Sequence, residues 1–323
     1  MRELEDRYIS LLTDFGFKRI FGTAPNKELL ICFLNSLFDG TQVIRDVKYL
    51  NNEHLGDSSL DRKAIFDVYC EGENGEKFIV EMQNAYQEFF KDRSLFYTTF
   101  PIREQAEKGS EWDFRLAHVY TVALLNFDMH EDSFDADDIC HTVKLCDVKT
   151  NKVFYSKLDF IYVEIAKFDK TEDELVTLYD KWLYVLKNLS RLESRPKVLL
   201  DKVFDRLFEE AEIAKFTPRE LREYEDSRKA YRDLKNSLDT AKREGIAEGM
   251  EKGRAEERRK SLAEKREIAR QLLATGMPAE QVSAIVGLPM EELKDCWPLF
   301  RTNQKESHRL CTDIQQAQTV ALS

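Results

Sequence analysis

The chain has 323 residues, a mass of 37.9 kDa and a net charge of −11. Its 42% hydrophobic residues, with only 12 Gly and 7 Pro, exclude a disordered or collagen-like protein. No run reaches the roughly 18 apolar residues of a membrane span, and the charged start is unlike a secretory signal. We therefore expect a folded, soluble, cytoplasmic protein of one large or two modest domains, with no membrane partner.

Cysteine spacing and the distribution of charge bear on three properties: disulfide bonds, zinc binding and nucleic-acid binding. The six cysteines form no C-x-x-C pair and have no histidine at zinc-finger spacing, so neither a disulfide framework nor a zinc site is predicted. Residues 1–150 contain 28 Asp and Glu against 17 Lys and Arg, whereas the remainder is neutral. Proteins that bind nucleic acid are usually basic. Any DNA contact would therefore need a local patch, a bound cation or the C-terminal half.

The first 200 residues alternate between helix and strand patterns. Apolar spacing predicts a short helix, a turn at residues 22–25 and a longer helix from about Pro25. A further helix is predicted over 88–108, and another begins at Thr171, where Glu174 completes a capping-box spacing. Six β-branched and aromatic segments predict strands: 43–50, 64–70, 78–83, 119–125, 140–148 and 158–165. This mixed order predicts an α/β layer fold.

Beyond about residue 203 the pattern is helical and highly charged. Gly245, Gly249 and Gly253 recur every four residues, which indicates either a partner surface or hinge, or a tolerated weak helix. The basic stretch 252–270 is most simply a solvated helix face. Residues 268–297, with turns at Gly276 and Gly287, have the outline of a small helix-turn-helix unit. We divide the chain into an α/β domain, a charged connector, this helical unit and a disordered tail: 1–202, 203–267, 268–300 and 301–323.

The stretch from Lys63 to Gln83 reads as two strands joined by a tight turn, and the loop length decides which residues face each other. A two-residue Asn74-Gly75 loop places Asp67 opposite Met82. A three-residue loop with Gly75 in the left-handed conformation places Asp67 opposite Glu81. We expect the second register, which brings Gln83 onto the same face as the two carboxylates.

Two carboxylates at such a short distance from each other resist ionisation unless a cation compensates their negative charge. Mg²⁺ or Mn²⁺ typically takes one or two carboxylates and completes its shell with water and a substrate phosphate. The simpler alternative is that one carboxylate is exposed at a strand end or paired with Arg62 or Lys77. Spacing alone favours that alternative.

Several motifs carry a family resemblance. The pattern D-x(13)-E-x-Q on a hairpin resembles the active-site core of the PD-(D/E)XK nuclease superfamily, and more narrowly the Rpn family of recombination-promoting nucleases and putative transposases. The similarity extends, in order, over about residues 8–297. It includes Asp14 to Gly22 (D-x-x-F-K-x-x-F-G), Phe33-Leu-Asn35, Arg93-x-x-x-Tyr97 with Gln105 and Gly109, 160–168, 180–183 and the Gly245 to Gly253 helix.

The resemblance implies a restriction-endonuclease-like core, with a mixed central sheet flanked by helices and a helical C-terminal region. It implies metal ligation by Asp67, Glu81 and the backbone carbonyl of Met82, with catalysis by Asp67, Glu81 and Gln83. Mg²⁺ is the expected ion, with Mn²⁺ or Ca²⁺ as alternatives. Gln83 stands where the superfamily has lysine, so it can orient water but supplies no positive charge.

Four further residues are candidates for supporting the site or binding DNA, each with a structural alternative. Arg93 and Tyr97 share a helix face but also fit a salt bridge and a packed ring. Lys18 fits a phosphate contact or a surface role, and Glu28 fits a third carboxylate or a solvated first-turn acid.

The expected function is a metal-dependent DNA endonuclease linked to recombination or mobile elements, with possible self-association through the C-terminal helices. Two alternatives stay open. One is a catalytically weak nuclease-like scaffold that binds DNA or oligomerises, and the other is a hydrolase directed at RNA.

Overall fold

The computed structural model describes residues 6–54, 64–106, 113–131 and 134–296. The chain divides into two compact units between Leu238 and Asp239, and each unit is described by itself. Within the described ranges, no helix is both long and apolar enough to cross a membrane. Arg62, Gly109 and the tail 301–323 lie outside these ranges, so the predictions made for them stay predictions.

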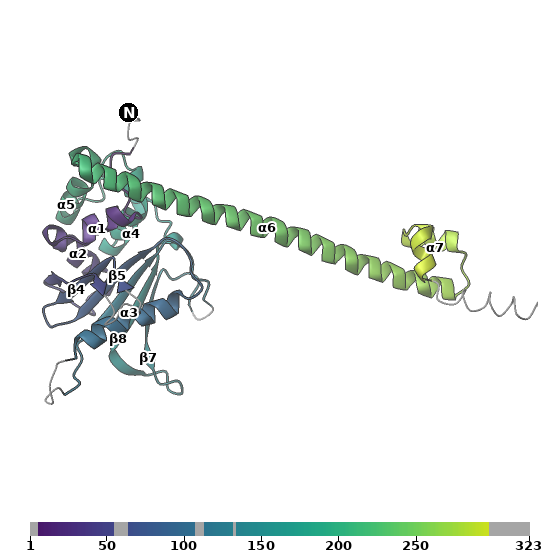
Figure 1. Cartoon of the computed structure of the whole chain (residues 1–323), viewed down its shortest axis with the longest axis horizontal. Helices are drawn as coiled ribbons and strands as arrows, with labels where there is room; N and C mark the ends of the chain where they lie inside the picture. Colours follow the sequence, from purple (N-terminus) through teal and green to yellow (C-terminus); the bar gives the residue numbers. More distant parts are fainter. Residues whose placement is uncertain (1–5, 55–63, 107–112, 132–133, 297–323) are drawn as a thin grey trace, which may run out of the picture. The chain divides into compact units, whose positions relative to one another are not determined.

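The first unit is built on a mixed six-stranded sheet (Figure 1). In chain order its strands are β1 (Val47–Tyr49), β4 (Val68–Gly72), β5 (Lys77–Gln83), β6 (Val119–Leu125), β7 (Cys140–Cys146) and β8 (Val153–Glu164). Their order in space is β1-β4-β5-β6-β8-β7, with β5, β6 and β8 parallel and the other pairs antiparallel. The short strands β2 (Glu53–His54) and β3 (Ala64–Ile65) pair separately.

Helices cover both faces of this sheet, which confirms the predicted α/β layer fold (Figure 1). One face carries α1 (Asp14–Phe21), α2 (Lys27–Phe38), α4 (Leu178–Asn188) and α5 (Lys202–Ala211). The other face carries α3 (Phe90–Glu104). The 3₁₀ helices are η1 (Ala24–Asn26), η2 (Ile165–Lys167), η3 (Glu172–Glu174), η4 (Leu189–Arg191) and η5 (Ile213–Lys215).

The period-2 alternation of β5 sorts its side chains between two cores. Phe78, Val80 and Met82 enter the large core under α1, α2, α4 and α5. Ile79 enters a smaller cluster on the face of α3. Because successive residues of a strand point to opposite faces, Glu81 and Gln83 lie on the face of α3 as well.

Several boundaries differ from the predictions. The predicted strand 43–50 shortens to β1, and the predicted strand 64–70 is interrupted at residues 66–67. The last strand begins earlier, at Val153, because it continues through a hairpin with β7. Thr171 does not open the α-helix. It is the N-cap of η3, where its backbone N–H and hydroxyl donate to Glu174, the last residue of that short helix. The helix α4 begins after Thr177, whose hydroxyl accepts from the Asp180 N–H.

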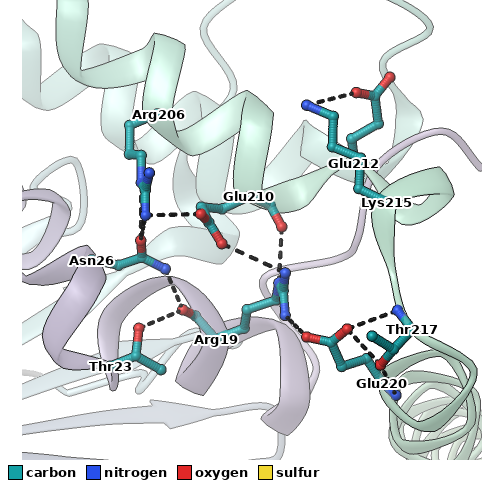
Figure 2. A network of polar contacts seen from close by, with 9 residues as sticks. All are labelled: Arg19, Thr23, Asn26, Arg206, Glu210, Glu212, Lys215, Thr217 and Glu220. Carbon is teal, nitrogen blue, oxygen red and sulfur yellow. Dashed lines mark hydrogen bonds and ion pairs between the residues drawn. The ribbon is translucent and has the colours of Figure 1, made fainter.

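The first compact unit extends beyond residue 202, where the sequence pattern predicts the end of the α/β domain. Residues of α5 and of the start of α6 (Pro218–Ala274) belong to the same core as α1, and the first unit extends to Leu238. Arg19 of α1 connects this helix to α5 and to the start of α6, and we call this contact the junction (Figure 2). Its guanidinium donates to the Glu210 backbone carbonyl at 2.9 Å and to a Glu220 carboxylate oxygen at 2.6 Å. Arg206 joins the network by donating to Asn26, whose amide donates to the Arg19 carbonyl.

Glu220 makes the stability of this junction depend on pH. Its carboxylate accepts from the Thr217 N–H, the Thr217 hydroxyl and Arg19, and these bonds lower its pKa to about 2 from an ordinary 4.5. The stabilisation is therefore present above pH 4.5 and is lost as the pH falls toward 2. In urea unfolding we expect Glu220→Gln to cost stability at pH 7, with the difference from wild type shrinking below pH 4.5.

The matched control for this prediction is Glu223→Gln on the same helix. Glu223 forms an exposed ion pair with Arg219, and such pairs contribute little to stability. A difference between Glu220→Gln and wild type that stays constant down to pH 2 would contradict the prediction.

The described part of the second unit is helical. It contains the end of α6, α7 (Ala279–Val286), α8 (Met290–Leu293) and the 3₁₀ helix η6 (Lys294–Cys296). Gly276 and Gly287 have φ values of 87° and 66°, which confirms both predicted turns. A small core includes Ala269, Val282 and Leu293. A Cβ placed at Gly245, Gly249 or Gly253 meets no atom of the described chain within 4 Å, so self-association through this stretch stays a prediction.

Candidate active site

The turn between β4 and β5 sets the register of the site. Gly75 has φ +84°, and the Gly72 N–H donates to the Glu76 carbonyl at 2.8 Å across a three-residue loop. Val68 consequently pairs with Val80, which leaves Asp67 beside Glu81. The predicted three-residue register is therefore confirmed.

Each of the two carboxylates accepts a backbone N–H from the opposite side of the hairpin. The Asp67 N–H donates to Glu81 Oε1 at 3.2 Å, and the Met82 N–H donates to Asp67 Oδ2 at 2.9 Å. Gln83 Nε2 donates to Glu81 Oε2 at 3.2 Å, so all three predicted site side chains are in one cluster. Lys77, the alternative partner that the sequence offers for one carboxylate, pairs with Glu71 at 2.8 Å instead.

Two cationic side chains approach this pair from different helices. Lys18 Nζ, on α1, lies 3.8 Å from Asp67 Oδ1 and 2.6 Å from Asp14 Oδ1. Arg93, on α3, donates through Nη1 to Gln87 and lies over the ring of Tyr97. Its Nε and Nη2 atoms are buried without a hydrogen-bond partner in the described chain. Both positive charges lower the pKa values of Asp67 and Glu81.

Burial nevertheless dominates the titration of the pair. Glu81 is only 6% exposed, and burial followed by the charge of Asp67 raises its pKa to about 8. Burial also raises the pKa of Asp67, although the Met82 N–H and Lys18 act in the opposite direction. Burial therefore favours the protonated form of Glu81, and a cation that binds beside this carboxylate competes with the proton.

This raised pKa predicts that Glu81 opposes folding at alkaline pH. Its contribution is most favourable below an ordinary pKa of 4.5 and is lost as the pH rises through 8. In thermal unfolding with EDTA, we expect Glu81→Gln to gain stability relative to wild type between pH 5 and pH 9. Glu71→Gln, on the same hairpin, serves as the control. An unchanged difference between Glu81→Gln and wild type over this range would contradict the prediction.

Comparison with known proteins identifies a family whose model matches this chain. A family model described as PD-(D/E)XK nuclease family transposase matches residues 11–241, well over half of the chain. The chain belongs to this family. The match agrees with the resemblance to Rpn nucleases and putative transposases, and the observed sheet with its flanking helices fits a restriction-endonuclease-like core. Neither the curated proteins nor the solved structures include a significant match.

The donor atoms of this PD-(D/E)XK protein suit a hard divalent cation of the kind such nucleases generally use. Asp67 and Glu81 offer carboxylate oxygens at one point of the sheet. The Met82 N–H faces Asp67, and because the N–H and C=O of one strand residue point to the same side, the Met82 carbonyl faces that edge too. Among the described residues no group of three or more His, Cys, Asp or Glu is placed to hold a metal ion. A site built on Asp67 and Glu81 would offer two carboxylates, and Mg²⁺ typically takes one or two.

The remaining predicted residues separate into two groups. Tyr97 lies at the site, since its ring packs edge-to-face on Phe66 at 5.2 Å, and burial and the charge of Glu81 raise its pKa. Glu28 is exposed in the first turn of α2, and none of its described contacts reaches Asp67 or Glu81. The structure therefore favours the solvated first-turn acid for Glu28.

Sequence reasoning overlooked Asp14 as part of the site. Asp14 holds Lys18 Nζ at 2.6 Å and so determines where this cation lies beside Asp67. The signal was present in the sequence, because an acid and a lysine four residues apart face each other on one helix.

Proposed function

We propose that this chain is a metal-dependent endonuclease that hydrolyses DNA phosphodiester bonds. The observation that carries the proposal is the meeting of Asp67 and Glu81 on the β4–β5 hairpin of a PD-(D/E)XK family protein. A buried carboxylate and a half-buried one, both with raised pKa values, form a site that a divalent cation would stabilise. Asp67, Glu81 and the Met82 carbonyl would hold that cation, with Mg²⁺ as the expected ion and Mn²⁺ or Ca²⁺ as alternatives.

A bound divalent ion would supply an activated water and stabilise charge on the phosphate. The protein contributes the placement of the reacting groups. Gln83, on the same face as Glu81, has a carboxamide that can orient the attacking water. Arg93 presents two buried N–H groups without partners in the described chain, and its charge keeps the carboxylates closer to ionisation. The Tyr97 ring packs against Phe66, the residue that precedes Asp67.

DNA is the proposed partner, and recombination or the movement of mobile elements is the proposed context, because the family is one of transposases. The five described cysteines are free, which supports a reducing compartment such as the cytoplasm. A second candidate function, a DNA-binding or oligomerising scaffold, is supported by the identity of residue 83. Gln83 supplies no positive charge, and this favours a weak nuclease that acts as a DNA-binding or oligomerising scaffold.

The experiment is cleavage of supercoiled plasmid by the full chain in Mg²⁺, Mn²⁺, Ca²⁺ or EDTA. We expect nicked or linear product with Mg²⁺ or Mn²⁺ and none with EDTA. Binding of DNA without cleavage in any of the metals would overturn the endonuclease and favour the scaffold. Stronger inhibition by RNA than by competing DNA would indicate an RNA substrate.

A further inference from the structure

Gln83 is a neutral residue beside the two carboxylates, so its position in the site carries no positive charge. Hydrolysis of a phosphodiester gathers negative charge on the phosphate oxygens, and a fixed cation beside them stabilises that charge. Gln83 offers only a carboxamide, and its Nε2 already donates to Glu81. If this chain cleaves DNA, as proposed above, a cation from elsewhere in the fold would add to the charge stabilisation that the divalent ion supplies.

Of the two cations that act on the carboxylate pair, Lys18 is better placed to meet a substrate. Its side chain is 38% exposed, and Nζ lies 3.8 Å from Asp67 Oδ1. Arg93 is less accessible to a substrate, since its Nε and Nη2 atoms are buried and its Nη1 donates to Gln87 at 2.6 Å. An incoming phosphate can therefore reach the Lys18 ammonium from solvent.

The fold fixes the position of Lys18 through helix α1. The Thr13 hydroxyl caps this helix by accepting from the Gly16 N–H at 3.1 Å. Arg19, the next residue, anchors α1 to α5 and to the start of α6 through the network in Figure 2. Asp14 then holds Nζ at 2.6 Å on the helix surface. The ammonium is thus held in place before substrate binds, which is the condition for effective charge stabilisation.

We propose that Lys18 is a catalytic residue that contacts the scissile phosphate and supplies the positive charge that Gln83 cannot. The proposal rests on the proposed nuclease function and extends it to a residue from a separate element, α1. Lys18 and Asp14 then act together, with Asp14 as the positioning residue. The motif lysine of the superfamily would thereby be replaced from across the sheet.

The test compares single-turnover DNA cleavage by wild type, Lys18→Ala, Lys18→Arg and Lys27→Ala at saturating Mn²⁺ and DNA. We expect Lys18→Ala to slow cleavage by about 10²-fold and Lys18→Arg to retain most of the rate. Lys27, the first residue of α2, is the matched control. Its side chain is 42% exposed, and its ammonium pairs with Asp46 at 2.6 Å, as that of Lys18 pairs with Asp14. Lys27→Ala is expected to cleave at the wild-type rate. Adding Gln83→Lys to Lys18→Ala is expected to restore part of the lost rate.

Two further readouts separate catalysis from structure. In Lys18→Ala the melting temperature should stay within error of wild type, because the residue is partly exposed. Mn²⁺ affinity should change much less than the cleavage rate, because Lys18 acts on Asp67 through its charge and is not a metal ligand. A slow variant with equally weakened Mn²⁺ binding or a lower melting temperature would overturn the inference in favour of a structural role. Wild-type cleavage by Lys18→Ala, with an inactive Asp67→Asn, would overturn the inference alone. A wild type that cleaves in no metal would overturn both the inference and the proposed function.

Discussion

Asp67→Asn is expected to lower the rate of plasmid cleavage by on the order of 10³-fold in Mg²⁺ or Mn²⁺. The change keeps the size of the side chain and an oxygen that can accept from the Met82 N–H. It removes the negative charge that would hold the cation beside Glu81. The same variant should bind Mn²⁺ at least tenfold more weakly by calorimetry, because one of the two carboxylates is lost.

The control for Asp67→Asn is Glu71→Gln on the same hairpin. Glu71 pairs with Lys77 at 2.8 Å and is not part of the proposed metal site. We expect this variant to cleave at the wild-type rate, with no more than a small loss of stability. Cleavage by Asp67→Asn at the rate of Glu71→Gln would rule out Asp67 as a ligand and with it the proposed site.

Trp182→Ala is expected to produce the largest loss of stability of any single substitution discussed, about 3–5 kcal/mol. Trp182 is fully buried where α1, α2, α4 and α5 meet on the sheet. Its ring lies 5.6 Å from that of Phe21, 5.8 Å from that of Phe33 and 5.1 Å from that of Phe204. Truncation leaves a cavity that these rigid rings cannot close.

Urea unfolding at pH 7 measures this loss, with Val176→Ala as the control. Val176 precedes the same helix but is 84% exposed, so its truncation should cost less than about 0.5 kcal/mol. Trp182→Phe should fall between the two, because it retains part of the ring. A Trp182→Ala protein as stable as Val176→Ala would show that packing of this aromatic cluster does not stabilise the fold.

The central strands could be predicted from sequence because their signals are local. The predicted strand 119–125 coincides with β6, a fully buried strand between parallel neighbours, where a continuous apolar run is expected. The hairpin register followed from one glycine, because Gly75 adopts a positive φ that selects the three-residue loop. Asp67 and Glu81 were therefore identified as neighbours without knowledge of any distant contact.

The end of the first unit could not be predicted in the same way. Charged amphipathic helices such as α5 look alike whether they cover their own core or another one. Phe204 and Leu207 pack with Trp182, a contact that depends on how the chain folds back onto the sheet. For the same reason Thr171 was assigned to the wrong helix, since its capping signal is satisfied within the short helix η3.

Sequence by itself determined the strands, the tight turn and hence the pairing of the two acids, because each follows from backbone geometry within about twenty residues. Only the tertiary structure decided which cations accompany them. Lys18 and Arg93 come from helices on opposite faces of the sheet, and Arg19 sets the position of α1 through residues 191 and 201 positions away. Contacts of that range depend on the packing of whole elements, which no local pattern encodes.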